Sequence, residues 1–281
     1  MKVVFFGSSH YVIPVIEELK NNFGLSLVVT TEKNPTDPVH SYSIKSKLQY
    51  YVVLDSSAKN LVEKIKEIRP DIGVLASFGQ IVPREILDLF PNGILNIHPS
   101  LLPRYRGPTP VQTAILNEDK KTGATIIKLD EKIDHGPILA QEEEEILADD
   151  TTLSLQKRLF EKGAKLVGSM IRTIELGKKA EEISQDDSNA TYTTPLTRDS
   201  GLIDLKSPPS KQVLERMLRA YFPWPGVWFK TLLNGKEVIV KLLPEKIQVE
   251  GKKPMSYKDF VNGYKEGKQV LEILGYGGLR L

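Results

Sequence analysis

The chain has 281 residues, of which 40% are hydrophobic and 26% charged, and its formal net charge is +2. It contains no cysteine, which excludes disulfide bonds and thiolate catalysis. No apolar run approaches the ~20 residues of a membrane span, and the run from Met1 to Gly7 is too short for a signal peptide. We therefore expect a cytoplasmic protein without a membrane partner, and at ~150 residues per domain the length predicts two domains.

Short apolar runs alternate with a helical pattern at the start of the chain. Residues 2–6 and Leu25–Thr30 are typical of buried strands, and Tyr11–Leu19 has the apolar spacing of a helix. This order predicts an α/β fold of Rossmann-like type, with a mostly parallel sheet and helices on both faces. The first turn, residues 7–10, lacks the G-x-G-x-x-G pattern, so we do not expect a dinucleotide cofactor.

The same alternation continues to about residue 176. The polar segment Thr31–Lys47 contains Pro35 and Pro38 and is predicted to be a loop. We expect helices at Lys59–Ile68, Pro83–Leu89, Pro110–Asn117 and Thr151–Leu176, and strands at Asp71–Phe78, Gly93–Leu95, Ala124–Leu129 and Ile138–Ile146. Residues 177–190 are polar and predict a linker, which divides the chain into domains at 1–189 and 190–281.

The C-terminal part differs from the rest in charge. Residues 190–281 hold 15 Lys and Arg against 9 Asp and Glu, whereas the remainder holds 23 against 27. The excess of positive charge is a hint of a polyanionic partner, although on charge alone ordinary solvated lysines are the favoured explanation. Its expected elements are a helix at Lys211–Ala220, an aromatic cluster at Tyr221–Phe229, strands at Glu237–Leu243 and Ile247–Glu250, and a helix from Tyr257.

Three polar residues follow predicted strands. Asn96 and His98 are two apart, so on an extended chain they point the same way, and Asp134 lies in the turn after a later strand. If all three lie at one edge of a parallel sheet, they suit transfer of an acyl or one-carbon group to an amine. Asn96 would stabilise a developing oxyanion, His98 would move the proton, and Asp134 would orient the imidazole or take protons through a water.

Simpler interpretations of these residues remain open at this point. An isolated Asn-x-His is more often a turn or a hydrogen-bonded histidine, and Asp134 beside Gly136 is most often a turn residue. The aromatic cluster is more typical of a domain core than of a platform for bases. The remaining histidines are explained as loop residues, and their spacing predicts no metal site: His10, His40 and His135.

Two long motifs resemble the folate-dependent formyltransferases: NIHPSLLPRYRG at 96–107 and LDEKIDHG at 129–136. In that family, 10-formyltetrahydrofolate gives its formyl group to an amine. The resemblance implies that Asn96, His98 and Asp134 are the catalytic residues. It also implies a pterin pocket lined, partly through backbone groups, by Phe78, Gly79, Gln80, Ile81, Val82, Leu129, Asp130, Glu131, Lys132 and Ile133.

The C-terminal part resembles the methionyl-tRNA formyltransferase branch of the family, in LTRDSGLID at 196–204, RAYFPWPG at 219–226 and EGKKPMSYKDF at 250–260. This resemblance implies a methionyl-initiator tRNA as partner, a role in translation initiation, and an OB-like barrel that binds the tRNA phosphates. The candidate tRNA contacts are Arg104, Arg106, Arg219, Lys252 and Lys253. We expect a monomer.

Two departures from the branch concern tRNA binding and leave the folate chemistry untouched. The segment Thr31–His40 lacks the length and basic, glycine-rich character of the usual loop, and residues 234–251 are too short for a full barrel, so we expect an abbreviated one. The alternatives are a sugar-nucleotide N-formyltransferase, which would share the catalytic set, and a non-catalytic RNA-binding protein, against which the intact Asn, His and Asp set argues.

Overall fold

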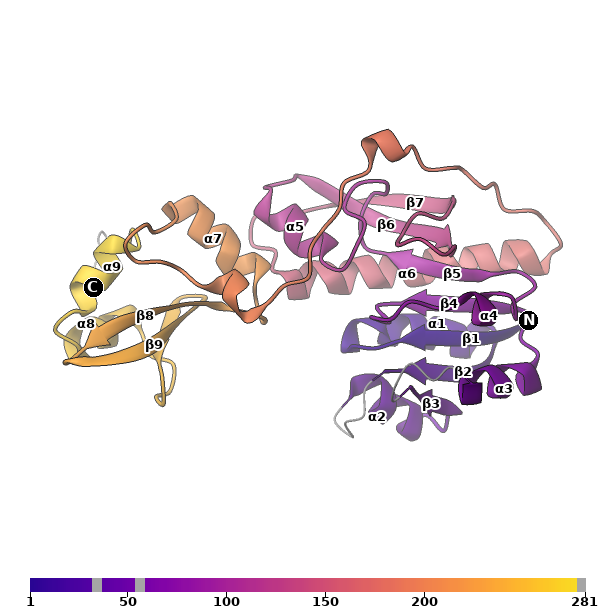
Figure 1. Ribbon diagram of the computed structural model, residues 1–281, viewed down its shortest axis with the longest axis horizontal. Coiled ribbons are helices and arrows are strands. Elements are labelled where there is room, and N and C mark those ends of the chain that lie inside the picture. The colour runs from indigo at the N-terminus through magenta and orange to yellow at the C-terminus, as the bar shows by residue number, and fades with distance from the viewer. Residues whose placement is uncertain (32–36, 54–58, 277–281) are drawn as a thin grey trace. The chain divides into compact units, whose positions relative to one another are not determined.

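The computed structural model describes residues 1–31, 37–53 and 59–276, and Figure 1 shows its elements. Within these ranges the chain divides into two compact units, each assembled from separate segments. The first unit comprises Met1–Pro110, Lys121–Glu145 and Gln156–Thr193, and the second comprises Val111–Lys120, Ile146–Leu155 and Thr194–Leu281. In the described part of the chain, no helix is both long and apolar enough to cross a membrane.

The first unit is built on a sheet of seven described strands in the order β3-β2-β1-β4-β5-β6-β7. The strands are β1 (Lys2–Gly7), β2 (Gly24–Thr30), β3 (Tyr50–Val52), β4 (Ile72–Ala76), β5 (Ile94–His98), β6 (Lys121–Lys128) and β7 (Ile138–Glu145). β1 to β5 pair in parallel, whereas β6 is antiparallel to both β5 and β7. The predicted mostly parallel sheet is confirmed, and β3 is a strand that the sequence pattern did not indicate.

Alternate residues of β1 point into two separate cores, as the period of a strand requires. Val3 and Phe5 belong to one core, which also contains buried residues of α1 (Ile13–Asn22) and α6 (Thr152–Glu175). Val4 and Phe6 belong to the other, with residues of α3 (Lys59–Ile68) and α4 (Arg84–Leu87). Each large buried side chain contributes ~1.5–3 kcal/mol. The predicted helices on both faces of the sheet are therefore confirmed.

One predicted loop contains a helix. The segment Thr31–Lys47 forms α2 at Pro38–Lys45. Residues 32–36, which include Pro35 and half of the segment Thr31–His40, lie outside the described residues. The Asp37 side chain caps α2 by accepting from the backbone N–H of Val39 (3.1 Å) and His40 (3.2 Å). Asp followed by Pro is a helix-start signal, because proline needs no hydrogen-bond partner in the first turn. The prediction was wrong because we weighted Pro38 as a breaker.

The second unit contains a three-stranded antiparallel sheet in the described residues, ordered β10-β9-β8. Its strands are β8 (Val227–Leu233), β9 (Lys236–Leu243) and β10 (Lys246–Val249), and its helices are α5 (Pro110–Leu116), α7 (Lys211–Ala220), α8 (Tyr257–Gly263) and α9 (Gly267–Ile273). The Ser256 hydroxyl accepts from the Asp259 N–H (3.1 Å), which confirms the predicted start of α8. The sequence pattern did not indicate α9.

The aromatic cluster before and within β8 has both buried and exposed members. Tyr221, Trp228 and Phe229 are buried, and the Trp228 indole N–H donates to the Arg198 carbonyl (2.9 Å). Trp224, in contrast, is 56% exposed. The interpretation of the cluster as a domain core is therefore confirmed for its buried members.

Candidate active site

Asn96 and His98 lie on β5 and share one face of the sheet. Their neighbours Leu95 and Ile97 point into the core below α1 and α6, so Asn96 and His98 point to the opposite face, together with Ile94. They are only 5% and 4% exposed, respectively. Buried polar side chains need hydrogen-bond partners, and the partners found here define the site.

Asp134 reaches this face by a route that the sequence did not predict. We expected its preceding strand to be parallel to β5, which would place Asp134 at the shared carboxyl edge. β6 is antiparallel instead, with Leu95 opposite Lys128, so β6 ends beside the amino end of β5. The prediction that Asp134 follows a strand parallel to β5 was therefore wrong, although Asp134 does lie beside Asn96.

The segment 129–137 brings Asp134 back over the sheet face. Its base is closed by a hydrogen bond from the Lys128 N–H to the Pro137 carbonyl (3.1 Å). Gly136 packs so tightly there that a Cβ atom would lie 1.8 Å from the Lys128 carbonyl oxygen, so only glycine fits. Asp134 itself has a φ of 48°, which is uncommon for a residue with a side chain.

The three side chains meet at one place. Asn96 Nδ2 donates to Asp134 Oδ1 (3.1 Å), and the Gly107 backbone N–H donates to Asp134 Oδ2 (2.8 Å). The same Oδ2 lies 3.5 Å from His98 Nδ1. Asp134 is therefore held by two donors, and its carboxylate faces the imidazole of His98.

The tautomer of His98 follows from its other nitrogen. His98 Nε2 lies 2.9 Å from the Tyr105 carbonyl oxygen, and because a carbonyl only accepts, we assign the hydrogen to Nε2. Nδ1 is then the nitrogen that gains or loses a proton. Tyr105 has a φ of 63°, and such strained residues persist where the surroundings hold them in place and cluster at functional sites.

The loop after β5 is held by side chains of β6 and β7. The Thr125 hydroxyl donates to the Ser100 carbonyl (2.6 Å) and accepts from the Leu102 N–H (3.3 Å). Gln141 Nε2 donates to the Leu102 carbonyl (3.0 Å) and to the Thr125 hydroxyl (2.8 Å). The Tyr105 N–H in turn donates to the Thr191 hydroxyl (2.8 Å), so the residue whose carbonyl orients His98 is also held by hydrogen bonds.

A small cavity of about 130 Å³ lies beside Asn96 and Asp134. Its other lining residues are Leu75, Gln80, Ile81, Val82, Leu129, Asp130, Glu131, Lys132 and Ile133. Eight of the ten predicted pocket residues thus line one cavity. The exceptions are Phe78, which packs edge-to-face on Phe6 with ring centres 5.6 Å apart, and Gly79, which lies next to it in the chain.

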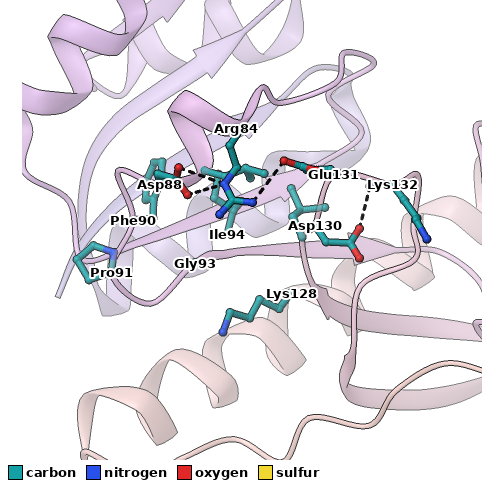
Figure 2. A pocket seen from close by; sticks show the side chains of 12 residues that line it. Arg84, Asp88, Phe90, Pro91, Gly93, Ile94, Lys128, Asp130, Glu131 and Lys132 are labelled. Atoms are coloured by element: carbon teal, nitrogen blue, oxygen red, sulfur yellow. Dashed lines mark hydrogen bonds and ion pairs between the residues drawn. The ribbon is translucent and has the colours of Figure 1, made fainter.

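The segment Leu129–Lys132 also lines a larger hollow of about 600 Å³ (Figure 2). Figure 2 shows Arg84 bridging Asp88 and Glu131, with N–O distances of 2.8 Å and 3.3 Å. Arg84 on α4 thus connects this helix to Glu131 in the segment Leu129–Lys132 through exposed side chains. Neither Asn96 nor Asp134 lines the larger hollow, so its size does not make it the reaction site.

The predicted tRNA contacts occupy different environments. Arg104 is exposed, with its guanidinium 4.8 Å from the centre of the Tyr105 ring. Arg219 is half-buried and donates to the Asp150 carbonyl (3.0 Å), whereas Lys252 and Lys253 are exposed. These four residues remain predictions.

Arg106 is 1% exposed, which speaks against a contact with tRNA. Its Nη2 donates to Gln185 Oε1 (2.9 Å) and Asp187 Oδ1 (2.8 Å), and its Nη1 donates to the Tyr192 hydroxyl (3.1 Å). The hydrogen bond from Arg106 lowers the pKa of Asp187. A buried guanidinium with these protein partners is not available to a phosphate, so the structure does not support Arg106 as a tRNA contact.

Sequence reasoning missed the groups that orient the three side chains. The Tyr105 carbonyl and the Gly107 N–H act through backbone atoms, which every residue type has. The one signal in the sequence was the glycine at position 107. The structure explains it, because φ is 105° there and a Cβ atom would lie 2.9 Å from the Thr193 hydroxyl oxygen. Gln185 was missed because it lies in the predicted linker.

Comparison with known proteins shows which family the chain resembles. A family model described as formyl transferase matches residues 1–171. The methionyl-tRNA formyltransferase of Thermus thermophilus is 31% identical over 94% of this chain and 96% of its own length. That of a Roseiflexus species is 37% identical over 80% of this chain and 72% of its own. The crystal structure of a 4-N formyltransferase from Francisella tularensis shares the fold, with a TM-score of 0.68, 24% identity, and coverage of 86% of this chain and 97% of that one.

Proposed function

Because the chain belongs to the formyl transferase family, we propose that it transfers a formyl group from 10-formyltetrahydrofolate to the α-amino group of methionyl-initiator tRNA. The observation that carries the proposal is the extent of the similarity to methionyl-tRNA formyltransferases, which spans 94% of the chain and includes the C-terminal region. The clustering of Asn96, His98 and Asp134 supplies the chemistry. We place the activity in the cytoplasm, at the start of translation.

The three side chains divide the work of transfer. The acceptor amine forms a bond to the formyl carbon, the bond from that carbon to the donor nitrogen breaks, and the amine proton ends on the donor nitrogen. One N–H of the Asn96 amide donates to Asp134. The second N–H is the donor that stabilises the oxyanion developing on the formyl oxygen. His98 carries the proton at Nδ1, and Asp134 stabilises the protonated imidazole.

The small cavity fits part of the co-substrate. Its volume of about 130 Å³ is below the ~300–1,000 Å³ that encloses a drug-sized ligand, so it suits one ring system rather than the whole molecule. The walls combine apolar side chains of Leu75, Ile81 and Val82 with the polar segment 129–133. When bound, the co-substrate supplies a formyl group on a nitrogen that can leave.

Two large apolar side chains at this cavity are unusually exposed, Ile81 at 76% and Ile133 at 59%. We expect them to contact the ring of the co-substrate. Ile81→Ala should raise KM for the formyl donor ~10-fold, through loss of ~1–2 kcal/mol of apolar contact, while the melting temperature stays unchanged. Steady-state kinetics with varied donor would measure the effect. Ile44→Ala, at an apolar residue on α2 that is 55% exposed, is the control; equal KM values for the two variants would contradict this role.

We assign tRNA binding to the C-terminal region, residues 190–281, and propose that its small antiparallel sheet is an abbreviated OB-like module. The excess of Lys and Arg in this region, 15 against 9 acidic residues, supports a polyanionic partner. Lys252 and Lys253 lie shortly after β10, which ends at Val249, and both are exposed. Residues 1–189 would then carry the folate site and the transfer chemistry.

The two lysines give a direct test of this assignment. Changing both Lys252 and Lys253 to Glu should raise KM for tRNA. The negative slope of log binding constant against log salt concentration should become shallower by about 2, if each lysine neutralises one phosphate. Filter binding at several salt concentrations would measure the slope. Lys178 and Lys179, shortly after α6, are also adjacent and exposed. Changing both of them to Glu is the matched control. A slope that changes equally in both variants would contradict the assignment.

The proposed activity is tested by offering labelled formyl donor with two acceptors, methionyl-initiator tRNA and an amino-sugar nucleotide. We expect label on the tRNA. Label on the sugar nucleotide alone would assign the chain to the sugar N-formyltransferases. Transfer to neither, combined with salt-sensitive retention of tRNA, would leave the non-catalytic RNA-binding protein as the function.

A further inference from the structure

The segment between α6 and the C-terminal region is fixed against the active site of the first unit. Ile183 exchanges two backbone hydrogen bonds with Ile138 at the start of β7 (2.8 and 2.9 Å). Farther along, the Arg106 N–H donates to the Thr191 carbonyl (2.8 Å), and the Thr193 N–H donates to the Arg106 carbonyl (2.8 Å). The segment expected to be a linker is therefore anchored on both sides of Gln185.

Gln185 uses both ends of its carboxamide. Its Oε1 accepts from Arg106 Nε (3.1 Å) and Nη2 (2.9 Å). Its Nε2 donates to the backbone carbonyls of Asp134 (2.9 Å) and Gly136 (2.8 Å). Arginine only donates and carbonyls only accept, so the partners themselves fix which end is the oxygen and which is the nitrogen.

The two carbonyls that Gln185 holds are those on either side of His135, at the strained part of the segment. Asp134 has a φ of 48°, a conformation that persists only where the surroundings enforce it. Its carboxylate receives the Gly107 N–H and Asn96 Nδ2, and faces His98 Nδ1. Holding the Asp134 carbonyl therefore sets the direction of the carboxylate that the proposed transfer uses.

The other end of Gln185 reaches the loop that orients His98. Arg106 is buried, and it directly follows Tyr105, whose carbonyl holds His98 Nε2. One carboxamide thus connects the segment that carries Asp134 with the loop that orients His98. We propose that Gln185 is a positioning residue that sets Asp134 against His98 for formyl transfer, an inference that rests on the proposed function.

The sharpest variant is Gln185→Glu. It keeps the shape and the oxygen that accepts from Arg106, but it places a carboxylate oxygen against the two carbonyls. The melting temperature should stay near that of the wild type, whereas kcat should fall ~10–100-fold because Asp134 moves from its working position. KM for tRNA should not change. The Gly107 N–H donates a hydrogen bond to the Asp134 carboxylate, so its hydrogen exchange should become faster. NMR can follow this exchange without any substrate.

Tyr192→Phe is the matched control, because the Tyr192 hydroxyl also accepts from the Arg106 guanidinium (3.1 Å), whereas Asp187 lies 3.5 Å from His135 in the segment that carries Asp134. It should leave kcat and the Gly107 exchange rate close to wild type. Wild-type kcat and exchange in Gln185→Glu would overturn the proposal, and so would a loss of kcat that only follows a loss of melting temperature. If the wild type transfers no formyl group to any acceptor, the proposed function fails, and the exchange of Gly107 still decides whether Gln185 positions Asp134.

Discussion

Replacing His98 by alanine should lower kcat for formyl transfer by ~10²–10⁴. His98 Nε2 is engaged by the Tyr105 carbonyl, so Nδ1, 3.5 Å from Asp134 Oδ2, is the nitrogen that can carry the amine proton. Without it, the side chain that would carry the proton from the acceptor amine to the leaving nitrogen is missing. Single-turnover formylation at saturating donor measures the chemical step and excludes product release as a cause.

Because His98 is buried, its removal can also affect folding, so a second variant is needed. His98→Asn keeps a hydrogen-bonding group near the position of Nδ1 but cannot shuttle a proton, and we expect it to be as slow as the alanine variant with a higher melting temperature. The control is His40→Ala. His40 packs on Tyr50 of β3, and three strands (β2, β1 and β4) separate β3 from β5 in the sheet. A His98→Asn enzyme with wild-type kcat would exclude the proton-transfer role.

Replacing Asn96 by alanine should lower kcat by ~10²–10³, which is the usual cost of losing one donor to a developing oxyanion. KM for either substrate should change little, because the donor acts mainly in the transition state. Asn96→Asp is the more informative variant. It keeps the volume of the side chain but removes both N–H groups and places a second carboxylate beside Asp134, where Asn96 Nδ2 now donates at 3.1 Å.

We therefore expect Asn96→Asp to be at least as slow as Asn96→Ala near neutral pH, measured by the same single-turnover assay. The matched control is Asn92→Asp, in the turn before β5, where the amide donates to the Asp71 carbonyl (3.0 Å) and does not line the cavity beside Asp134. An Asn96→Ala enzyme whose defect lies in KM alone would assign Asn96 to substrate binding instead of transition-state stabilisation.

The strands of the first unit, except β3, and most of its helices could be predicted because their pattern is local. The apolar run before Gly7 and the helical spacing after Tyr11 each report on burial at a known period. Asn96 and His98 could be placed on one face for a similar reason, because side chains two apart on a strand point the same way. The α2 helix was missed although its cap is local, because Asp37-Pro38 was interpreted as a break and not as a start.

The sequence by itself therefore determined the α/β class, the pair on β5 and, through two long motifs, the family. Only the tertiary structure decided how Asp134 joins that pair, because strand direction depends on which neighbour β6 meets and not on its own pattern. The orientation of the site depends on the Tyr105 carbonyl, the Gly107 N–H and the amide of Gln185, whose partners His98 and Asp134 lie 7, 27 and 51 residues away along the chain, respectively. Backbone groups are the same in every residue, so no local pattern reveals which of them will meet a catalytic side chain.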